Sequence, residues 1–320
     1  MKKCLIIGSG GFIGSYLTEF LLNKNLDIYG TIYRNTKNID HLKDSITILE
    51  CDISDKSKVE NIIEKVKPDY IFYLATQNFV APSWKDPETT LKTNILGTLY
   101  LLDAIRKTKL DPIVEVISSS AVYGMNYDNE IPVKENKEFR PLNPYSVSKI
   151  GVDMLAYLYW QAYKMKIIRI RPFNVTGPRR TFDVCSDFAK GIVEIEKGRR
   201  KVLEVGNLES IRDITDVRDA VKALWLLSEK GQFGDAYNLC CGKGYKIKEI
   251  LDKLISLSES KNEIKIYQDP EKIRKTDDLI QIGDNSKLLE IGWMPEIPIE
   301  CTLKDLLDYW RNSIEKELLI

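Results

Sequence analysis

Short apolar runs alternate with stretches of helical periodicity along the first half of the chain. We expect strands at the apolar runs, which are residues 5–7, 27–33, 46–50, 69–74, 113–118 and 167–171. We expect helices between them, at residues 12–24, 56–66, 88–107 and 144–164. Alternation of this kind is typical of βαβ units, which build a parallel sheet covered by helices on both faces.

The alternation becomes less regular after about residue 172. Helical patterns persist at residues 184–198, 216–230, 246–259 and 302–317, between loops rich in Gly, Arg, Asp and Lys. We therefore predict an α/β fold, in which a Rossmann-type doubly wound parallel sheet carries a smaller C-terminal substrate-binding lobe. In such folds the ligand binds in a crevice at the carboxyl ends of the strands.

A glycine-rich segment joins the first expected strand to the first expected helix. Gly8, Gly11 and Gly14 have the spacing GxxGxxG, and Phe12 and Ile13 open the helix. The first glycine permits a tight turn, the second lets the backbone approach a pyrophosphate, and the third lets the helix pack against the strand. The helix N-terminus then offers unpaired N–H groups to the phosphates. The segment predicts a dinucleotide-binding site.

The residues after the second expected strand bear on which dinucleotide binds. A cofactor with a free ribose 2′-OH usually meets a carboxylate about 20 residues after the glycines. Residues 29–35 contain no Asp or Glu, but they include Arg34. A guanidinium suits a 2′-phosphate, so the sequence favours NADP and leaves NAD as the alternative.

We assign residues 1–172 to an NAD(P)-binding domain and residues 173–320 mainly to the substrate lobe, with some return to the first domain.

Two further strand ends fall where this fold places cofactor contacts. Asp52 and Ile53 follow the third expected strand, where a carboxylate can accept the adenine amino group. Leu74, Ala75 and Thr76 end the fourth, where the backbone passes the ribose and phosphates. We include these five residues in the expected cofactor site.

The start of the helix at 144–164 carries the candidate catalytic residues. Tyr145 and Lys149 are four residues apart, so they share one helix face. A phenol of pKa about 10 is a poor acid–base group at neutral pH, but a nearby ammonium and a positively charged nicotinamide ring lower that pKa. We therefore expect Tyr145 to exchange a proton while hydride moves between cofactor and substrate. The strand before it ends in serines 118–120, whose hydroxyls can bind the same substrate oxygen.

Composition narrows the classes of function. The chain has 47 Lys and Arg against 47 Asp and Glu, so no global field favours nucleic acid or an acidic membrane. His41 is the single histidine, which argues against Ser-His-Asp hydrolysis and His-ligated metals. The six cysteines lack metal-ligand spacing, and no window approaches the ~20 apolar residues of a membrane span. We expect a cytoplasmic enzyme without a metal.

Taken together, these motifs resemble the extended short-chain dehydrogenase/reductase family of nucleotide-sugar epimerases, dehydratases and reductases. The likeness runs from residue 3 to about residue 311, and it is strongest to the branch of GDP-mannose 4,6-dehydratases and GDP-4-keto-6-deoxy-D-mannose reductases. The segments that carry it are residues 81–84, 171–174, 177–178, 187–190, 205–209, 212–213 and 216–219.

The resemblance implies roles for further residues. Ser119, four residues before Tyr123, would be the third catalytic residue and would contact the substrate. The residues that it implies for holding a GDP-linked or other nucleotide-linked sugar are Asn174, Lys190, Arg212 and Arg274. Around Arg274 the chain departs from the family pattern, which usually has Arg-Pro with a nearby Glu.

A second departure bears on the reaction. Dehydratases of this family carry an acidic residue two positions after the catalytic Ser or Thr, as the base for the C5 proton, whereas this chain has Ala121. A methyl group accepts no proton, so the sequence disfavours 4,6-dehydration. We expect hydride transfer between NAD(P) and C4 of the sugar, as reduction of a 4-keto-6-deoxy sugar or as the reverse oxidation. A 4-epimerase with retained NAD is the alternative enzyme, and a non-catalytic dinucleotide sensor would tend to lose Tyr145 or Lys149.

The helix that carries Tyr145 also has an apolar stripe: Ile150, Met154, Leu155, Leu158 and Tyr159. Family members commonly dimerise through this helix, so the resemblance implies a homodimer or a higher homo-oligomer. Packing of the same stripe against the sheet is the alternative.

Overall fold

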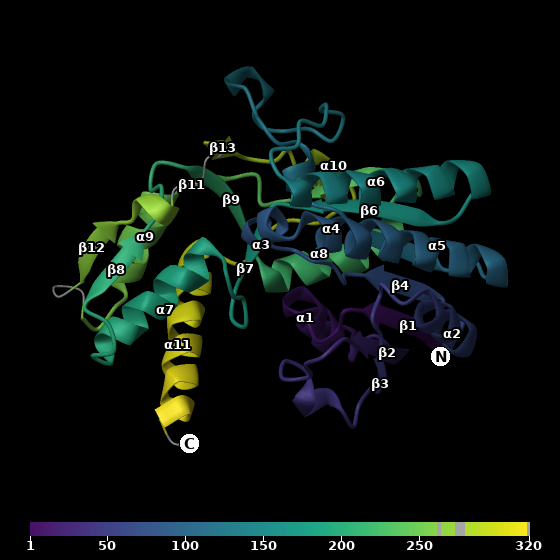
Figure 1. Cartoon of the computed structure of the whole chain (residues 1–320), viewed down its shortest axis with the longest axis horizontal. Coiled ribbons are helices and arrows are strands. Elements are labelled where there is room, and N and C mark those ends of the chain that lie inside the picture. The colour runs from purple at the N-terminus through teal and green to yellow at the C-terminus, as the bar shows by residue number, and fades with distance from the viewer. Residues whose placement is uncertain (261–263, 273–278, 319–320) are drawn as a thin grey trace.

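A computed structural model describes residues 1–260, 264–272 and 279–318. Its largest element is a seven-stranded parallel sheet with the order β10-β6-β5-β4-β1-β2-β3 (Figure 1). The strands are β1 (Lys2–Ile7), β2 (Leu26–Ile32), β3 (Thr47–Glu50), β4 (Tyr70–Tyr73), β5 (Ile113–Ile117), β6 (Ile167–Pro172) and β10 (Ala236–Leu239). The strand order reverses between β1 and β4, which is the switch point of a doubly wound sheet. The predicted fold class is confirmed.

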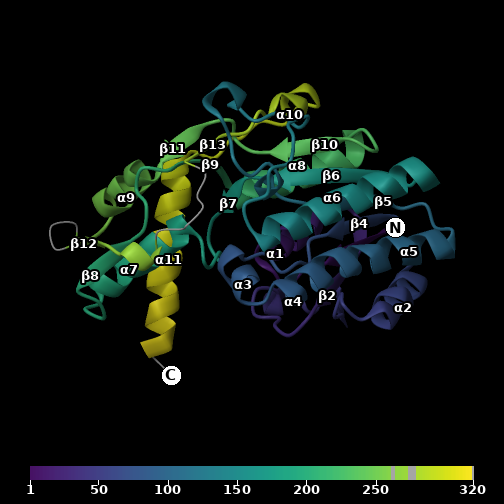
Figure 2. The same ribbon diagram turned by 45° about the horizontal axis from the view of Figure 1, so that its top comes forward.

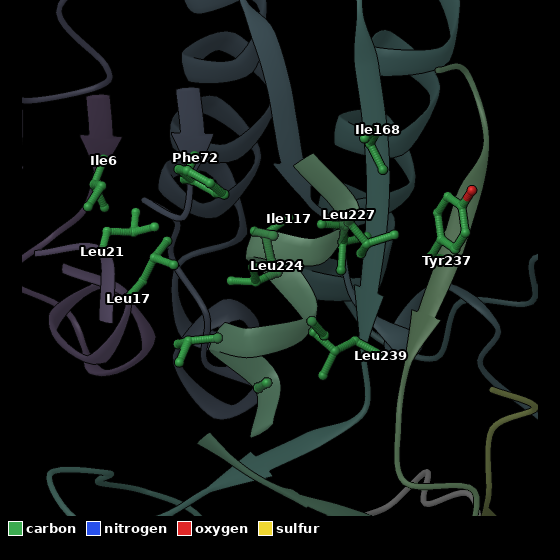
Figure 3. Close-up of a cluster of buried hydrophobic side chains, with 14 of the residues drawn as sticks. Ile6, Leu17, Leu21, Phe72, Ile117, Ile168, Leu224, Leu227, Tyr237 and Leu239 are labelled. Carbon is green, nitrogen blue, oxygen red and sulfur yellow. The ribbon is translucent and has the colours of Figure 1, made fainter. Parts of the chain in front are cut away.

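Helices cover both faces of this sheet (Figures 1 and 2). On one face lie α1 (Phe12–Leu21) and α8 (Val217–Lys230), and on the other lie α2 (Lys56–Val66), α5 (Gly97–Thr108) and α6 (Pro144–Tyr163). Successive strand side chains point to opposite faces, so the sheet has an apolar core on each side. Figure 3 shows the first core, where side chains of the sheet meet those of α1 and α8: Ile6, Phe72, Ile117, Ile168, Leu17, Leu21, Leu224 and Leu227.

The single helix expected over residues 88–107 is broken into three parts. A short helix α4 (Pro87–Leu91) is followed by a π-helical turn over Lys92–Leu96 and then by α5. Another short helix, α3 (Val80–Lys85), precedes them. A π-helical turn shifts the direction of the side chains that follow it, and here it contains the buried residue Asn94.

The second lobe has its own core beside the sheet (left in Figure 1). Its strands are β7 (Asn174–Thr176), β8 (Val202–Val205), β9 (Ile211–Asp216), β11 (Gly244–Lys246), β12 (Lys265–Gln268) and β13 (Ile280–Gln281). Its helices are α7 (Val184–Glu196), α9 (Ile247–Ser256) and α11 (Ile299–Leu318). Strand β9 pairs with β7, β11 and β13, and β8 pairs with β12. Because β7 follows β6 almost directly, this lobe starts at the carboxyl edge of the large sheet.

The chain returns to the first sheet after residue 172. Helix α8 packs beside α1, and β10 forms the edge strand next to β6. A short helix, α10 (Ser286–Glu290), then packs against β10. Within the part of the chain that the structure describes, no helix combines the length and apolar character needed to cross a membrane.

Candidate active site

The turn after β1 has the geometry of a phosphate cradle. Gly8 has φ +99°, and the N–H of Gly11 donates to its carbonyl oxygen at 3.0 Å. A Cβ at Gly14 would lie 2.1 Å from the same oxygen, so the helix packs this closely on the strand only because Gly14 has no side chain. Gly11 precedes α1 without a side-chain cap, which leaves the first N–H groups of Phe12 and Ile13 free for an anion. The residues present therefore fit a dinucleotide pyrophosphate.

Arg34 lies just beyond β2, on the exposed side of this turn. Its guanidinium stacks on the ring of Tyr33, with 4.6 Å between Cζ and the ring centroid, and donates to the Tyr33 hydroxyl at 2.8 Å. No described carboxylate forms an ion pair with it. This charge is therefore accessible to an anionic ligand.

The other expected cofactor contacts lie at the ends of β3 and β4. Asp52 accepts from the N–H and hydroxyl of Ser54, at 2.9 and 2.7 Å, and Ile53 is buried. The N–H groups of Leu74 and Ala75 both donate to the Ile7 carbonyl at 2.9 Å. These contacts hold the carboxyl ends of β1 and β4 side by side.

Asn94 belongs to this site although the sequence did not single it out. Its Oδ1 accepts from the Thr76 hydroxyl at 2.9 Å and from the Gln77 N–H at 2.8 Å. Its Nδ2 donates to the Gln77 carbonyl at 3.0 Å and to the Ser148 hydroxyl at 2.8 Å. It thereby ties the loop after β4 to α6. The sequence does show a polar amide within an apolar helical pattern at this position. That pattern does not show that the helix breaks there.

The start of α6 is fixed at both the cap and the first turn. The Asn143 side chain accepts from the Ser146 N–H at 2.9 Å, and Pro144 occupies the first turn. The Tyr145 N–H donates to the hydroxyl of Ser83 at 3.2 Å. These contacts orient Tyr145, and the nearby Ser119 side chain lowers the pKa of its phenol. Two of the three expected catalytic residues therefore lie near each other.

Burial decides the direction of the pKa shift of Tyr145 in the protein alone. The lowering that we expect from Lys149 together with a bound nicotinamide stays a prediction. In the protein itself burial raises the pKa of Tyr145, while the Ser119 side chain and the charge of Arg180 oppose that rise. Burial is the largest of these effects, so the phenol stays protonated at neutral pH.

Lys149 is almost fully buried, and its Nζ donates to the Ile117 carbonyl at 2.8 Å. Burial lowers the pKa of Lys149 to about 7, against a smaller opposing effect of Asp153. Its ammonium is thus only partly populated at neutral pH. A positively charged ammonium near Tyr145 was expected from the sequence, but the desolvation of this lysine was not.

A buried ion cluster holds α6 against β6. Asp153, one turn after Lys149, accepts from Arg169 Nη1 at 2.7 Å and from Arg171 Nε at 2.8 Å and Nη2 at 3.0 Å. Arg171 Nη1 also donates to the Tyr123 hydroxyl at 2.9 Å. Tyr123 and Arg171, which carried part of the family resemblance, therefore position the catalytic helix from inside the core.

The expected substrate residues lie in the second lobe. Asn174 on β7 donates to the Asp213 carbonyl at 3.0 Å, and Arg212 on β9 donates to the Ile211 carbonyl at 3.0 Å. Lys190 on α7 lies 5.2 Å from the Trp310 ring centroid and is about half exposed. Arg274 lies outside the described residues.

Asp187 on α7 lies near several charged side chains. Burial raises the pKa of Asp187 to about 6, and the charge of Asp183 adds to this effect. Lys272, Lys190 and Arg180 act in the opposite direction. Cations from α7, from the loop before it and from the turn after β12 therefore act on one carboxyl group, which the sequence did not single out for a role.

Comparison with known proteins identifies the family. The family model for GDP-mannose 4,6 dehydratase matches residues 5–306. The chain belongs to this family. The resemblance inferred from the sequence is confirmed, and the members related to this chain include both reductases and dehydratases.

Two curated relatives illustrate this range. GDP-6-deoxy-D-mannose reductase of Pseudomonas aeruginosa is 33% identical over 253 residues, which cover 78% of this chain and 83% of that protein. GDP-mannose 4,6-dehydratase of Vibrio cholerae is 30% identical over 365 residues, covering 98% and 96%. Among solved structures, RMD from Pseudomonas aeruginosa complexed with NADPH matches with a TM-score of 0.85 and 28% sequence identity. The match covers 98% of this chain and 100% of the RMD chain.

Proposed function

We propose that this protein transfers hydride between NADP and C4 of a GDP-linked sugar, and that its reaction is the reduction of a GDP-4-keto-6-deoxy-mannose-type substrate. The observation that carries the proposal is that Tyr145 and the buried Lys149, at the start of α6, lie against the end of β5, where Lys149 donates to the Ile117 carbonyl two residues before Ser119. Relatives that act on GDP-sugars support the substrate class. Arg34 and the NADPH complex of a relative support NADP over NAD.

The nicotinamide supplies the hydride that reaches C4 in the reductive direction. Tyr145 gives its phenolic proton to the C4 oxygen as that oxygen becomes a hydroxyl, and it regains a proton from solvent. Reduction starts from the protonated phenol, which is the form that burial favours. Ser119 donates a hydrogen bond to the same oxygen, and Lys149 tunes Tyr145 and contacts the nicotinamide ribose.

The surroundings of Ser119 argue against dehydration. Ser119 precedes a single 3-10 turn, Ser120–Val122, and the N–H of Ala121 donates to its hydroxyl at 3.1 Å. The position of the dehydratase base thus holds a methyl group. We therefore favour reduction over 4,6-dehydration, although relatives of both kinds match this chain. The reverse oxidation would use the same residues.

We also propose a homodimer, or a higher homo-oligomer, built on the outer face of α6. Met154 and Leu158 of the apolar stripe are 40% and 52% exposed. Tyr159 instead packs into the core beneath the sheet, so part of the stripe serves the fold.

Tyr145→Phe tests the proposed chemistry. It removes the proton donor but leaves a ring of the same shape, so turnover of GDP-4-keto-6-deoxy-mannose with NADPH should fall about 10²–10⁴-fold, while NADPH affinity stays close to that of the wild type. Tyr163→Phe, at an exposed tyrosine on the same helix, is the matched control and should keep full turnover. Unchanged turnover in Tyr145→Phe would refute the catalytic assignment. Tightly retained NAD with interconversion of C4 epimers would favour the epimerase instead.

A further inference from the structure

The loop between β7 and α7, residues 177–183, connects the second lobe to the cofactor domain. Two of its non-glycine residues have left-handed backbones, Arg179 at φ +71° and Phe182 at φ +59°. Such conformations are costly for residues with a Cβ and persist where the surroundings hold them. The contacts of this loop, and not the intrinsic backbone preferences of its residues, therefore determine its shape.

Contacts on two sides of the glycine turn hold the loop. Arg179 Nη2 pairs with Glu19 Oε1 on α1 at 2.7 Å, and Arg179 Nη1 donates to the Ser15 hydroxyl at 3.2 Å. The ring of Phe182 packs edge-on against Phe79, with 5.2 Å between centroids. Because Phe79 directly precedes α3, the loop spans from α1 to the segment that follows β4.

Arg180 lies between these two anchors. Its guanidinium carbon is 5.4 Å from the ring centroid of Phe12, the first residue of α1. Its Nε is buried and has no hydrogen-bond partner among the described residues. The described carboxylate near it, Asp183, is 3.5 Å away, which is longer than an ordinary N–H···O hydrogen bond.

Asp183 is already engaged elsewhere. Its Oδ1 accepts from the N–H groups of Cys185 and Ser186, at 2.8 and 3.2 Å, and caps α7. Both of its oxygens are also within reach of the Thr176 hydroxyl, at 3.1 and 3.3 Å. The helix cap and the hydroxyl occupy this carboxylate, so the charge of Arg180 is not fully matched by it.

Electrostatics place Arg180 close to the reaction centre as well. Its charge opposes the rise in the pKa of Tyr145 and also that of Asp187 on α7. Arg180 is thus near the glycine turn, the candidate catalytic tyrosine and the cationic side of α7 at once. We propose that Arg180 is a diphosphate-binding residue.

This inference rests on the proposed function, which supplies two diphosphates: that of NADPH, near the start of α1, and that of the GDP-sugar. Both offer oxygens that a planar guanidinium binds through paired N–H groups. Arg179, the neighbouring arginine, cannot take this role because Glu19 and Ser15 hold its guanidinium. The adjacent arginines therefore have different tasks, one as an anchor and one as a ligand.

The test is direct binding of NADPH and of GDP, each alone, to Arg180→Met by calorimetry. Loss of a charge-assisted hydrogen bond should weaken at least one of the two by about 10–100-fold, with a smaller loss in Arg180→Lys. A loss for NADPH assigns Arg180 to the cofactor, and a loss for GDP assigns it to the sugar nucleotide. Arg106→Met, which removes the same charge at the last turn of α5, is the control and should change neither affinity.

Affinities of Arg180→Met within about twofold of wild type for both ligands would overturn the inference. If thermal melting shows Arg180→Met to be unfolded, the comparison is made on Arg180→Lys, for which affinities equal to wild type overturn the inference in the same way. Because the readout is binding, it does not depend on turnover. A wild-type protein that bound neither NADPH nor GDP would refute the proposed function and this inference together. Binding by wild type with no loss in the variant would refute this inference alone.

Discussion

Glu115 is a carboxyl group inside the apolar core. It lies on β5 between Phe72 of β4 and Ile168 of β6, in register with both. Strand alternation directs it to the same face as Ile117, toward the core under α1 and α8. Both of its carboxyl oxygens are buried without a hydrogen-bond partner among the described residues. Burial raises the pKa of Glu115 well above its ordinary value, so the group retains its proton in the folded protein.

The raised pKa of Glu115 makes the stability of the protein depend on pH. The folded state binds the proton more tightly than the unfolded state does, so stability falls as pH rises from the unfolded pKa of about 4.3 through the folded value. Glu115→Gln removes the titration and keeps the shape. Its free energy of unfolding relative to wild type should therefore be lowest at acid pH and should increase as pH rises.

Urea unfolding at several pH values between about 5 and 9 measures this difference. Glu115→Leu, which also removes the unpaired polar group, should be more stable than wild type by about 1–3 kcal/mol at neutral pH. A difference between Glu115→Gln and wild type that does not vary with pH would show that the carboxyl ionises freely in the folded state.

Some properties of individual residues could be predicted from the sequence and others could not. The types and spacing of Tyr145 and Lys149 made them the candidate catalytic pair, and the family resemblance added Ser119. The sequence did not show that burial would raise the pKa of Tyr145 and lower that of Lys149, because desolvation depends on every side chain packed around a group. The sequence also could not distinguish Arg179 from Arg180, because only the folded structure shows which of the two pairs with Glu19.

At the scale of elements, the position of α6 depends on Asp153. The side chain is fully buried and pairs with Arg169 and Arg171 of β6. Asp153→Asn leaves two buried guanidinium groups without a carboxylate, and breaking a buried pair in this way costs about 3–5 kcal/mol. We expect a loss of that size in the free energy of unfolding, measured by chemical denaturation.

The exposed pair of Glu88 and Lys92 on the α4 side of the same layer provides the comparison. Glu88→Gln should leave the unfolding midpoint nearly unchanged, because solvent screens exposed pairs. If Asp153→Asn were as stable as Glu88→Gln, the ion cluster would not anchor α6.

Length alone does not explain which elements were predicted, because β9 has six residues and was not among the expected strands. Six strands of the large sheet were predicted because each is a distinct apolar run next to a helical pattern. Strands β7, β11 and β13 have only two or three residues each, too few to show a period. The π-helical turn at Lys92–Leu96 preserves an overall helical pattern, so the break in the helix beside Asn94 could not be predicted.

At the scale of the whole molecule, the two lobes meet along the carboxyl edge of the large sheet. The cofactor turn, the serine-ended strand β5 and the start of α6 all lie at this edge, as expected for a doubly wound fold. The second lobe begins at the same edge through β7, and the 177–183 loop reaches back to α1. The arrangement places a candidate acid, Tyr145, between a dinucleotide site and a lobe that carries the expected nucleotide-sugar residues.

The central claim is hydride transfer from the nicotinamide to C4 of the sugar, and isotope transfer tests it most directly. The protein would be incubated with GDP-4-keto-6-deoxy-mannose and NADPH carrying deuterium at both positions of the nicotinamide C4. The account predicts one deuterium in each product molecule, located at sugar C4 by NMR and mass spectrometry. A GDP-sugar product without deuterium at C4, or no product while the protein binds both ligands, would contradict it.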